Sequence, residues 1–198
     1  MNPAAASLFL LAAFALLGSP GPGIAALVAV TRCNGLRAGL RYYAGLQLGL
    51  ALAAGVSAGG LLSLLAAFPF LLRLSSICAA IYLVYLAFKI GTAPVQSPDE
   101  QNRTGPSTLS GFILGLTNPK AYLAFGTLMA CYTLLPDRPT ADAFMKWALI
   151  VGVVILVDLA WLLVGAALHR ATLAPRIERM MNVAFAATIL IAAVAALA

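Results

Sequence analysis

Three positions in this chain combine polar or helix-breaking residues with long apolar surroundings, and each could contact a small charged molecule. Gly-Ser-Pro-Gly-Pro-Gly interrupts the first apolar stretch at residues 18–23, and Asn118-Pro119-Lys120 interrupts a later one. Asp158 lies in the middle of the stretch LIVGVVILVDLAWLLVG. A charged side chain at the centre of a membrane helix costs about 2.5–3.5 kcal/mol on insertion scales. Lys120 and Asp158 therefore predict a functional site.

The prolines predict that two membrane helices are broken. A proline in a helix interior lacks a backbone donor, clashes with the preceding turn and costs about 3 kcal/mol. Asn118 before Pro119 is typical of a helix start, because Asn caps the helix and Pro fits its first position. Backbone freed at that depth is tolerated only against protein or in a water-lined cavity. A kink that serves packing alone is the alternative at Pro22, and a structural ion pair is the alternative for Asp158.

The three positions lie at a similar depth. Pro22, Asn118 and Asp158 are each about eight to ten residues from the cytoplasmic end of their apolar stretch, or roughly 12–15 Å at 1.5 Å per residue. This depth is the middle of a core about 30 Å thick. Half-helices that start there favour an anion at their N-termini, and Asp158 favours a cation, so a zwitterionic amino acid fits both. We expect Lys120 and Asp158 to pair in the empty state and a solute to separate them.

Two further polar side chains are candidates for the same site. Tyr122 shares a helix face with Asn118, because the two are four residues apart. Gln47 lies in another apolar stretch and could donate a hydrogen bond across helices. The candidate substrate-binding residues are Pro20, Gly21, Pro22, Gly23, Gln47, Asn118, Pro119, Lys120, Tyr122 and Asp158.

The composition requires a membrane for these elements. The chain is 63% hydrophobic and 9% charged, whereas a soluble domain has about a quarter charged residues. Six apolar segments can be drawn, at 4–30, 42–65, 70–90, 109–135, 143–168 and 178–197. The third is the weakest, and a re-entrant segment there would leave five spans. We predict an all-α membrane protein of six transmembrane helices, with helices 1 and 4 broken.

The chain reads as one membrane domain over residues 1–198. A polar linker at 91–108 separates a first half, 1–90, from a second, 109–198. With three spans each, halves of the same fold must be inverted relative to each other, which is a recurring transporter architecture. Two rows of small residues, Gly45-Gly49-Ala53 and Ala51-Gly55-Gly59, predict close helix packing and a possible homo-oligomer contact.

The loop charges predict the orientation. Eight Lys and Arg residues fall in the first, third and fifth connections, and three (Arg73, Arg138 and Lys146) fall on the opposite side. This positive-inside bias places both termini outside. The lipid bilayer and a small-molecule substrate are the expected partners. The basic residues serve topology, so no nucleic-acid partner is expected, and the spacing of the cysteines predicts no metal site, redox site or cofactor.

These motifs resemble the lysine exporter (LysE/RhtB) family of bacterial amino-acid exporters over nearly the whole chain. The matching elements are Pro20-Gly21-Pro22, the glycines 35, 39, 45 and 49, Tyr82-Leu83-Val84-Tyr85-Leu86, Gly111-Phe112 and Asn118-Pro119-Lys120-Ala121. Gly23 departs from the Asn or Asp that the family often has, and Ala87 departs from a glycine. The resemblance implies a proton-driven exporter of amino acids or related metabolites in the bacterial plasma membrane, not an enzyme.

Two other functions compete with this interpretation. A cation or metal-ion exporter is one, but hard cations prefer several oxygen ligands and the spans hold a single carboxylate. A membrane enzyme that relays electrons between Cys33 and Cys131 is the other. These cysteines are expected about 30 Å apart, far beyond the reach of a disulfide.

Overall fold

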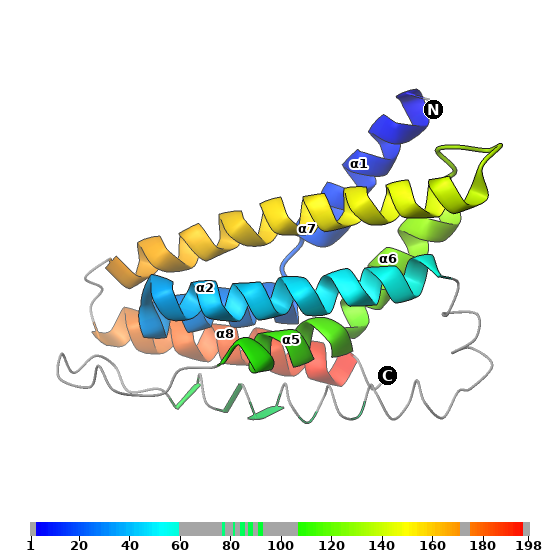
Figure 1. Ribbon diagram of the computed structural model, residues 1–198. Helices are drawn as coiled ribbons and strands as arrows, with labels where there is room; N and C mark the ends of the chain where they lie inside the picture. The colour runs from blue at the N-terminus through cyan, green and yellow to red at the C-terminus, as the bar shows by residue number, and fades with distance from the viewer. Residues whose placement is uncertain are drawn as a thin grey trace.

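The computed structural model describes residues 3–59, 107–170 and 175–195, together with a few single positions between 77 and 92. The elements in these ranges are all helices (Figure 1), which confirms the predicted all-α class for this part of the chain. They are α1 (Pro3–Gly18), α2 (Pro22–Ala58), α5 (Thr108–Thr117), α6 (Pro119–Cys131), α7 (Pro139–Arg170) and α8 (Pro175–Ala195). The predicted segment 70–90 and the linker 91–108 fall almost entirely outside the described residues.

Both predicted helix breaks are present. α1 ends at Gly18 and α2 begins at Pro22, with Gly21 extended at φ −145° and ψ −176°. α5 ends at Thr117 and α6 begins at Pro119, with Asn118 at φ −72° and ψ 106°. In each case proline occupies the first helical position, where its missing N–H has no intrahelical acceptor to lose.

The described helices include lengths suited to a membrane. α7 is long and apolar enough to cross a bilayer as one helix, and α1 with α2 forms a pair bent by 56° at the break. The predicted fifth and sixth segments, 143–168 and 178–197, correspond to α7 and α8. The start of α1 and the end of α8 point toward the same side of the view in Figure 1.

Gly35 turns the chain inside α2. It has φ 80° and ψ 171°, a conformation that favours glycine because it lacks a Cβ. Thr31 lies against Gly39, and Gly23 lies against Leu46, so the two pieces of α2 run antiparallel. The sequence predicted separate spans at 4–30 and 42–65 with a loop between them. The chain does reverse between these two segments, but the connection is a turn at Gly35 whose flanks stay helical.

Four glycines bring α2 and α5 into direct backbone contact. Gly45 and Gly49 face α5, and Gly111 and Gly115 face α2. A Cβ at any of them would overlap backbone atoms of the other helix. Small residues of this kind allow close approach between membrane helices, where apolar side chains gain little by leaving lipid.

This contact accounts for one of the two predicted rows of small residues. Gly45 and Gly49 are covered by α5 of the same chain, so this part of the first row does not face a second copy. In the second row, Trp147 of α7 lies beside Gly55, and its indole N–H donates to the carbonyl oxygen of Ala51 at 3.0 Å. A homo-oligomer through the second row stays a prediction.

Candidate functional site

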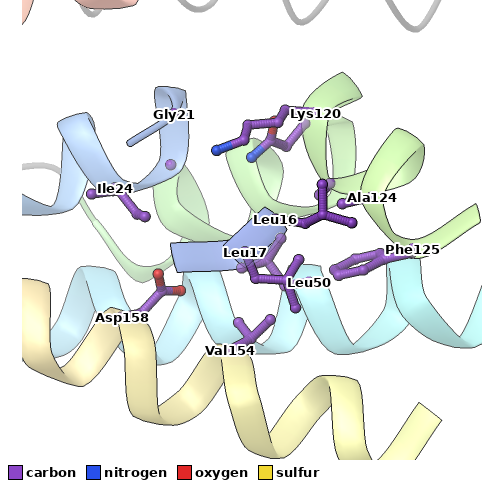
Figure 2. A pocket seen from close by; sticks show the side chains of 13 residues that line it. Leu16, Leu17, Gly21, Ile24, Leu50, Lys120, Ala124, Phe125, Val154 and Asp158 are labelled. Carbon is purple, nitrogen blue, oxygen red and sulfur yellow. The ribbon is translucent and has the colours of Figure 1, made fainter. Parts of the chain in front are cut away.

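Residues at the two helix breaks and on α7, together with apolar side chains of α1, α2 and α6, line a partly open cavity of about 50 Å³. Its lining residues are Leu16, Leu17, Gly21, Gly23, Ile24, Leu50, Asn118, Lys120, Ala121, Ala124, Phe125, Val154 and Asp158. Figure 2 shows the Lys120 and Asp158 side chains apart from each other in the cavity lining, with Leu17, Leu50 and Val154 to the right of Asp158. The structure thus brings residues of the three motifs together at one pocket, and their common depth in the membrane stays a prediction.

The structure gathers half of the ten predicted site residues at the cavity wall. Gly21, Gly23, Asn118, Lys120 and Asp158 line it directly. The other five lie outside the lining: Pro20 is exposed, Pro22 and Pro119 start their helices, Tyr122 is half-buried on α6, and Gln47 contacts Asp158. Their proposed contact with a solute stays a prediction.

Lys120 reaches across to the break between α1 and α2. Its ammonium group donates to the Ser19 hydroxyl at 2.8 Å and to the Ser19 carbonyl oxygen. Ser19 lies between the two helices, so its carbonyl oxygen belongs to neither helical ladder. Gly21 leaves the path open, because a Cβ there would lie 2.6 Å from Lys120 Cδ.

Asp158 has a different partner. The carboxylate is 4% exposed and accepts a hydrogen bond of 2.8 Å from the amide nitrogen of Gln47. Nearby on the same two helices, the Tyr43 hydroxyl donates to the carbonyl oxygen of Ile155 at 3.0 Å. The predicted direct pair between Lys120 and Asp158 is therefore absent from this structure, because Lys120 binds Ser19 at the helix break and Asp158 binds Gln47 of α2.

Asn118 is an N-cap residue whose side chain does not cap its helix. It is 6% exposed, and its side-chain oxygen has no hydrogen-bond partner among the described residues. Asn at this position normally stabilises a helix by about 1 kcal/mol, and a buried acceptor without a partner costs about 1–3 kcal/mol. The side-chain amide lies instead beside the start of α2, with its nitrogen 3.3 Å from where a Cβ of Gly23 would be.

Sequence reasoning missed the residues that complete this site. Ser19 could have been recognised from the sequence, because it is a polar residue inside the glycine–proline motif. Leu16, Leu17, Leu50, Phe125 and Val154 carried no such signal, because apolar residues are common throughout the chain.

A second buried charge pair joins the end of α6 to α7. Lys146 pairs with Asp142 at 2.8 Å, and each residue is 6% exposed. Lys146 also donates to the carbonyl oxygens of Met129 and Tyr132, at 2.8 and 2.9 Å. The sequence predicted Lys146 as a topology charge of a loop. The structure places Lys146 inside α7 and not in a loop, with its ammonium group bound to the carbonyl oxygens at the end of α6, and the side of the membrane stays a prediction.

Asp142 completes this network. Its other oxygen accepts hydrogen bonds from the backbone N–H groups of Leu134 and Leu135, at 2.6 and 2.8 Å. Burial raises the pKa of Asp142, but the hydrogen bonds from Lys146 and the two N–H groups and the charge of Lys146 outweigh it, so the pKa is lowered overall. Phe9 of α1 packs edge-to-face on Tyr132, with ring centroids 5.6 Å apart. Three helices thus meet at this end.

The comparison with known proteins settles the family. Residues 14–198 match the family described as LysE type translocator. The chain belongs to this family. LysE translocators are membrane proteins, which agrees with the long apolar α7 and with the predicted membrane character.

Two of the relatives are efflux proteins by name. The cysteine/O-acetylserine efflux protein of Salmonella typhimurium (strain LT2) is 30% identical over 161 residues, which cover 77% of this chain and 78% of the relative. The cysteine/O-acetylserine efflux protein of Escherichia coli (strain UTI89) is 28% identical over 183 residues, or 89% of each chain. No solved structure matches this LysE-family chain significantly.

Proposed function

We propose that this LysE-family protein exports amino acids or related small zwitterionic metabolites from the bacterial cytoplasm across the plasma membrane. The observation that carries the proposal is the pair of opposite charges, Lys120 and Asp158, at one cavity where two helices break. The solute carboxylate binds Lys120, and the solute ammonium group binds Asp158. Cysteine and O-acetylserine, the solutes named for the two relatives, are both zwitterions of this kind.

The helix starts add to the selectivity for a carboxylate. Pro22 and Pro119 each begin a helix whose free N–H groups and positive dipole end lie at the cavity, where a negative group is favoured. Gln47 orients Asp158 from the opposite side. A zwitterion therefore meets complementary charge at both of its ends.

The size of the cavity supports transport by alternating access. A cavity needs about 10–15 Å³ to hold one water molecule, so 50 Å³ has room for a few waters and not for an amino acid. Loading of an amino acid therefore requires the helices around the breaks to separate toward one side of the membrane.

The helix packing supports the proposal of six spans in two inverted halves. α1, the first part of span 1, packs on α7, and α5, the first part of span 4, packs on α2. Exchange of the two halves would convert one contact into the other, as inverted repeats require. In this arrangement both termini lie outside.

Protonation of Asp158 offers a route for coupling to the proton gradient. A neutral carboxyl group loses its attraction for the solute ammonium group, so binding of a proton favours release of the solute. Entry of the proton from outside would therefore drive export and return Asp158 to its empty state.

The decisive experiment replaces the carboxylate in Asp158→Asn and measures efflux of labelled cysteine and serine from proteoliposomes under a pH gradient. The variant should insert normally and lose gradient-driven efflux by at least about tenfold, because a buried ammonium partner is worth more than about 1.4 kcal/mol. Asp137→Asn, the same change in an exposed loop residue, is the matched control and should export like the wild type. Normal rate and normal pH dependence in Asp158→Asn would contradict the mechanism.

A further inference from the structure

Exposed arginines gather at one end of the helix bundle, away from the proposed transport site. They follow the turn in α2, end α7 and begin α8: Arg37, Arg41, Arg170, Arg176 and Arg179. The end of α7, the start of α8 and the residues after the α2 turn lie at the same end of the view in Figure 1. A direct bond joins two of these elements, because the Nδ1 atom of His169 donates to the carbonyl oxygen of Arg32 at 2.6 Å.

The charge at this end is not neutralised by the part of the chain that the structure describes. None of these arginines forms an ion pair with a described residue. The described acidic side chains lie elsewhere: Asp137 precedes α7, Asp142 is in its first turn and Asp158 is in its middle. Like charges at one place repel each other, so an anion that binds there is favoured.

The type of these residues points to a phosphate group. Membrane orientation requires only positive charge, and Lys and Arg serve it alike. A guanidinium group offers a planar fork of donors that matches a phosphate with two parallel hydrogen bonds, which an ammonium group cannot do. Arg37 and Arg41 are four residues apart and Arg176 and Arg179 are three apart, so each pair shares one helix face.

Apolar side chains accompany the arginines on two of the helices. They are exposed and occupy neighbouring positions: Leu36 and Leu40 on α2, and Ile177 and Met180 on α8. A soluble anion makes no use of such neighbours. A lipid presents a phosphate group to the arginines and an acyl chain to the apolar side chains beside them.

From these observations we propose that this end of the bundle binds an anionic membrane lipid, with its phosphate on the arginines and its acyl chains on the adjoining apolar residues. The predicted orientation of the chain places this end in the cytoplasmic leaflet, where basic surfaces attract anionic lipids. The arginines come from α2, α7 and α8, so a bound lipid bridges three helices. The proposal is independent of the solute that the protein carries.

The test titrates the purified protein in detergent with dioleoyl phosphatidylglycerol and, separately, with dioleoyl phosphatidylcholine, and counts bound lipids by native mass spectrometry. The two lipids share the phosphate and the acyl chains, and only phosphatidylglycerol has a net negative charge. The wild type should bind phosphatidylglycerol at least about tenfold more tightly. Arg37→Gln with Arg41→Gln should weaken this binding about 25-fold, because each arginine near a lipid surface contributes about fivefold. Arg138→Gln, in the exposed loop before α7, is the control and should bind like the wild type.

Arg37→Lys with Arg41→Lys separates phosphate recognition from simple charge. It keeps the charge that orients the chain, and it should bind phosphatidylglycerol at least about fivefold more weakly, because each lysine loses one of two parallel hydrogen bonds. Arg176→Gln with Arg179→Gln tests the same site from α8 if the α2 variants fail to insert. Equal binding of the two lipids by the wild type, unchanged affinity in the lysine variant, or displacement of the lipid by an equal concentration of inorganic phosphate would each contradict the proposal.

Discussion

The close contact of α2 and α5 predicts how much free energy of unfolding is lost when a side chain is added at the contact. In Gly115→Ala the new Cβ would lie 2.5 Å from the Leu46 carbonyl oxygen, 2.9 Å from the Leu50 nitrogen and 3.1 Å from the Gly49 Cα. Ordinary contacts begin at 3.4 Å, and these neighbours are backbone atoms that cannot rotate away. The two helices must therefore separate by about 0.9 Å.

The cost of this separation has two parts. Overpacking costs about 1–3 kcal/mol, and a gap of 0.5–1 Å forfeits about a quarter to a half of the dispersion energy along the contact. Alanine gains about 0.5–1 kcal/mol over glycine in a helix, which offsets part of it. We expect a net loss of about 2 kcal/mol in the free energy of unfolding.

Equilibrium unfolding in mixed detergent micelles, followed by circular dichroism, measures this loss. Gly152→Ala in α7 is the matched control, because a Cβ there meets nothing within 4 Å. The control should match or exceed the wild type by up to about 1 kcal/mol. If Gly115→Ala and Gly152→Ala have the same free energy of unfolding, α2 and α5 do not approach as closely as described.

Three further predictions concern the half-buried Lys120 and the buried pair of Asp142 and Lys146. Gly21→Ala should displace the Lys120 side chain from Ser19, because its Cβ would lie 2.6 Å from Lys120 Cδ, and the flexible end of the side chain can move. Efflux should fall at least about tenfold while the unfolding temperature stays within a few degrees of the wild type; an unchanged efflux rate would show that the position of Lys120 is irrelevant. The lowered pKa of Asp142 means that its stabilisation is fully present above the ordinary value of 3.8 and is lost as the pH falls through the lower folded value. Thermal unfolding between pH 6 and pH 2 should show this acid loss in the wild type, and Asp142→Asn should lack it. Lys146→Met should cost about 3–5 kcal/mol at neutral pH, because Asp142 keeps a buried charge without its cation.

Sequence reasoning succeeded where the determinant is local. Pro22 and Pro119 break helices because of their own covalent structure, so both breaks were predictable at the residue level. Their meeting with Asp158 at one cavity was also predictable, since helical rise converts residue counts into depth. The turn at Gly35 was harder to predict, because a glycine indicates that the backbone is free to turn and does not show that the chain reverses there.

The pairing of side chains could not be predicted in the same way. The rotation of each helix about its axis decides whether Lys120 faces Asp158 or Ser19, and an apolar stretch in lipid encodes that rotation weakly. Gln47 was expected to bond across helices, and the structure gives its partner as Asp158. The pair formed by Asp142 and Lys146 had a signal, because the two are four residues apart on one helix. We did not use this signal, because the count of loop charges for the membrane orientation included Lys146.

The bond between Lys120 and Ser19 has a consequence for the kinetics of an exporter. A solute carboxylate that binds the ammonium group of Lys120 must displace both oxygens of Ser19. The net binding free energy is therefore the difference between two similar interactions. Departure of the solute restores the original partners immediately and leaves no buried charge waiting for the next molecule. Weak retention speeds dissociation, and a carrier that releases its load quickly is ready sooner for another cycle. If the solute binds as proposed, the break in the first helix would set how fast it leaves, besides helping to decide which solute binds.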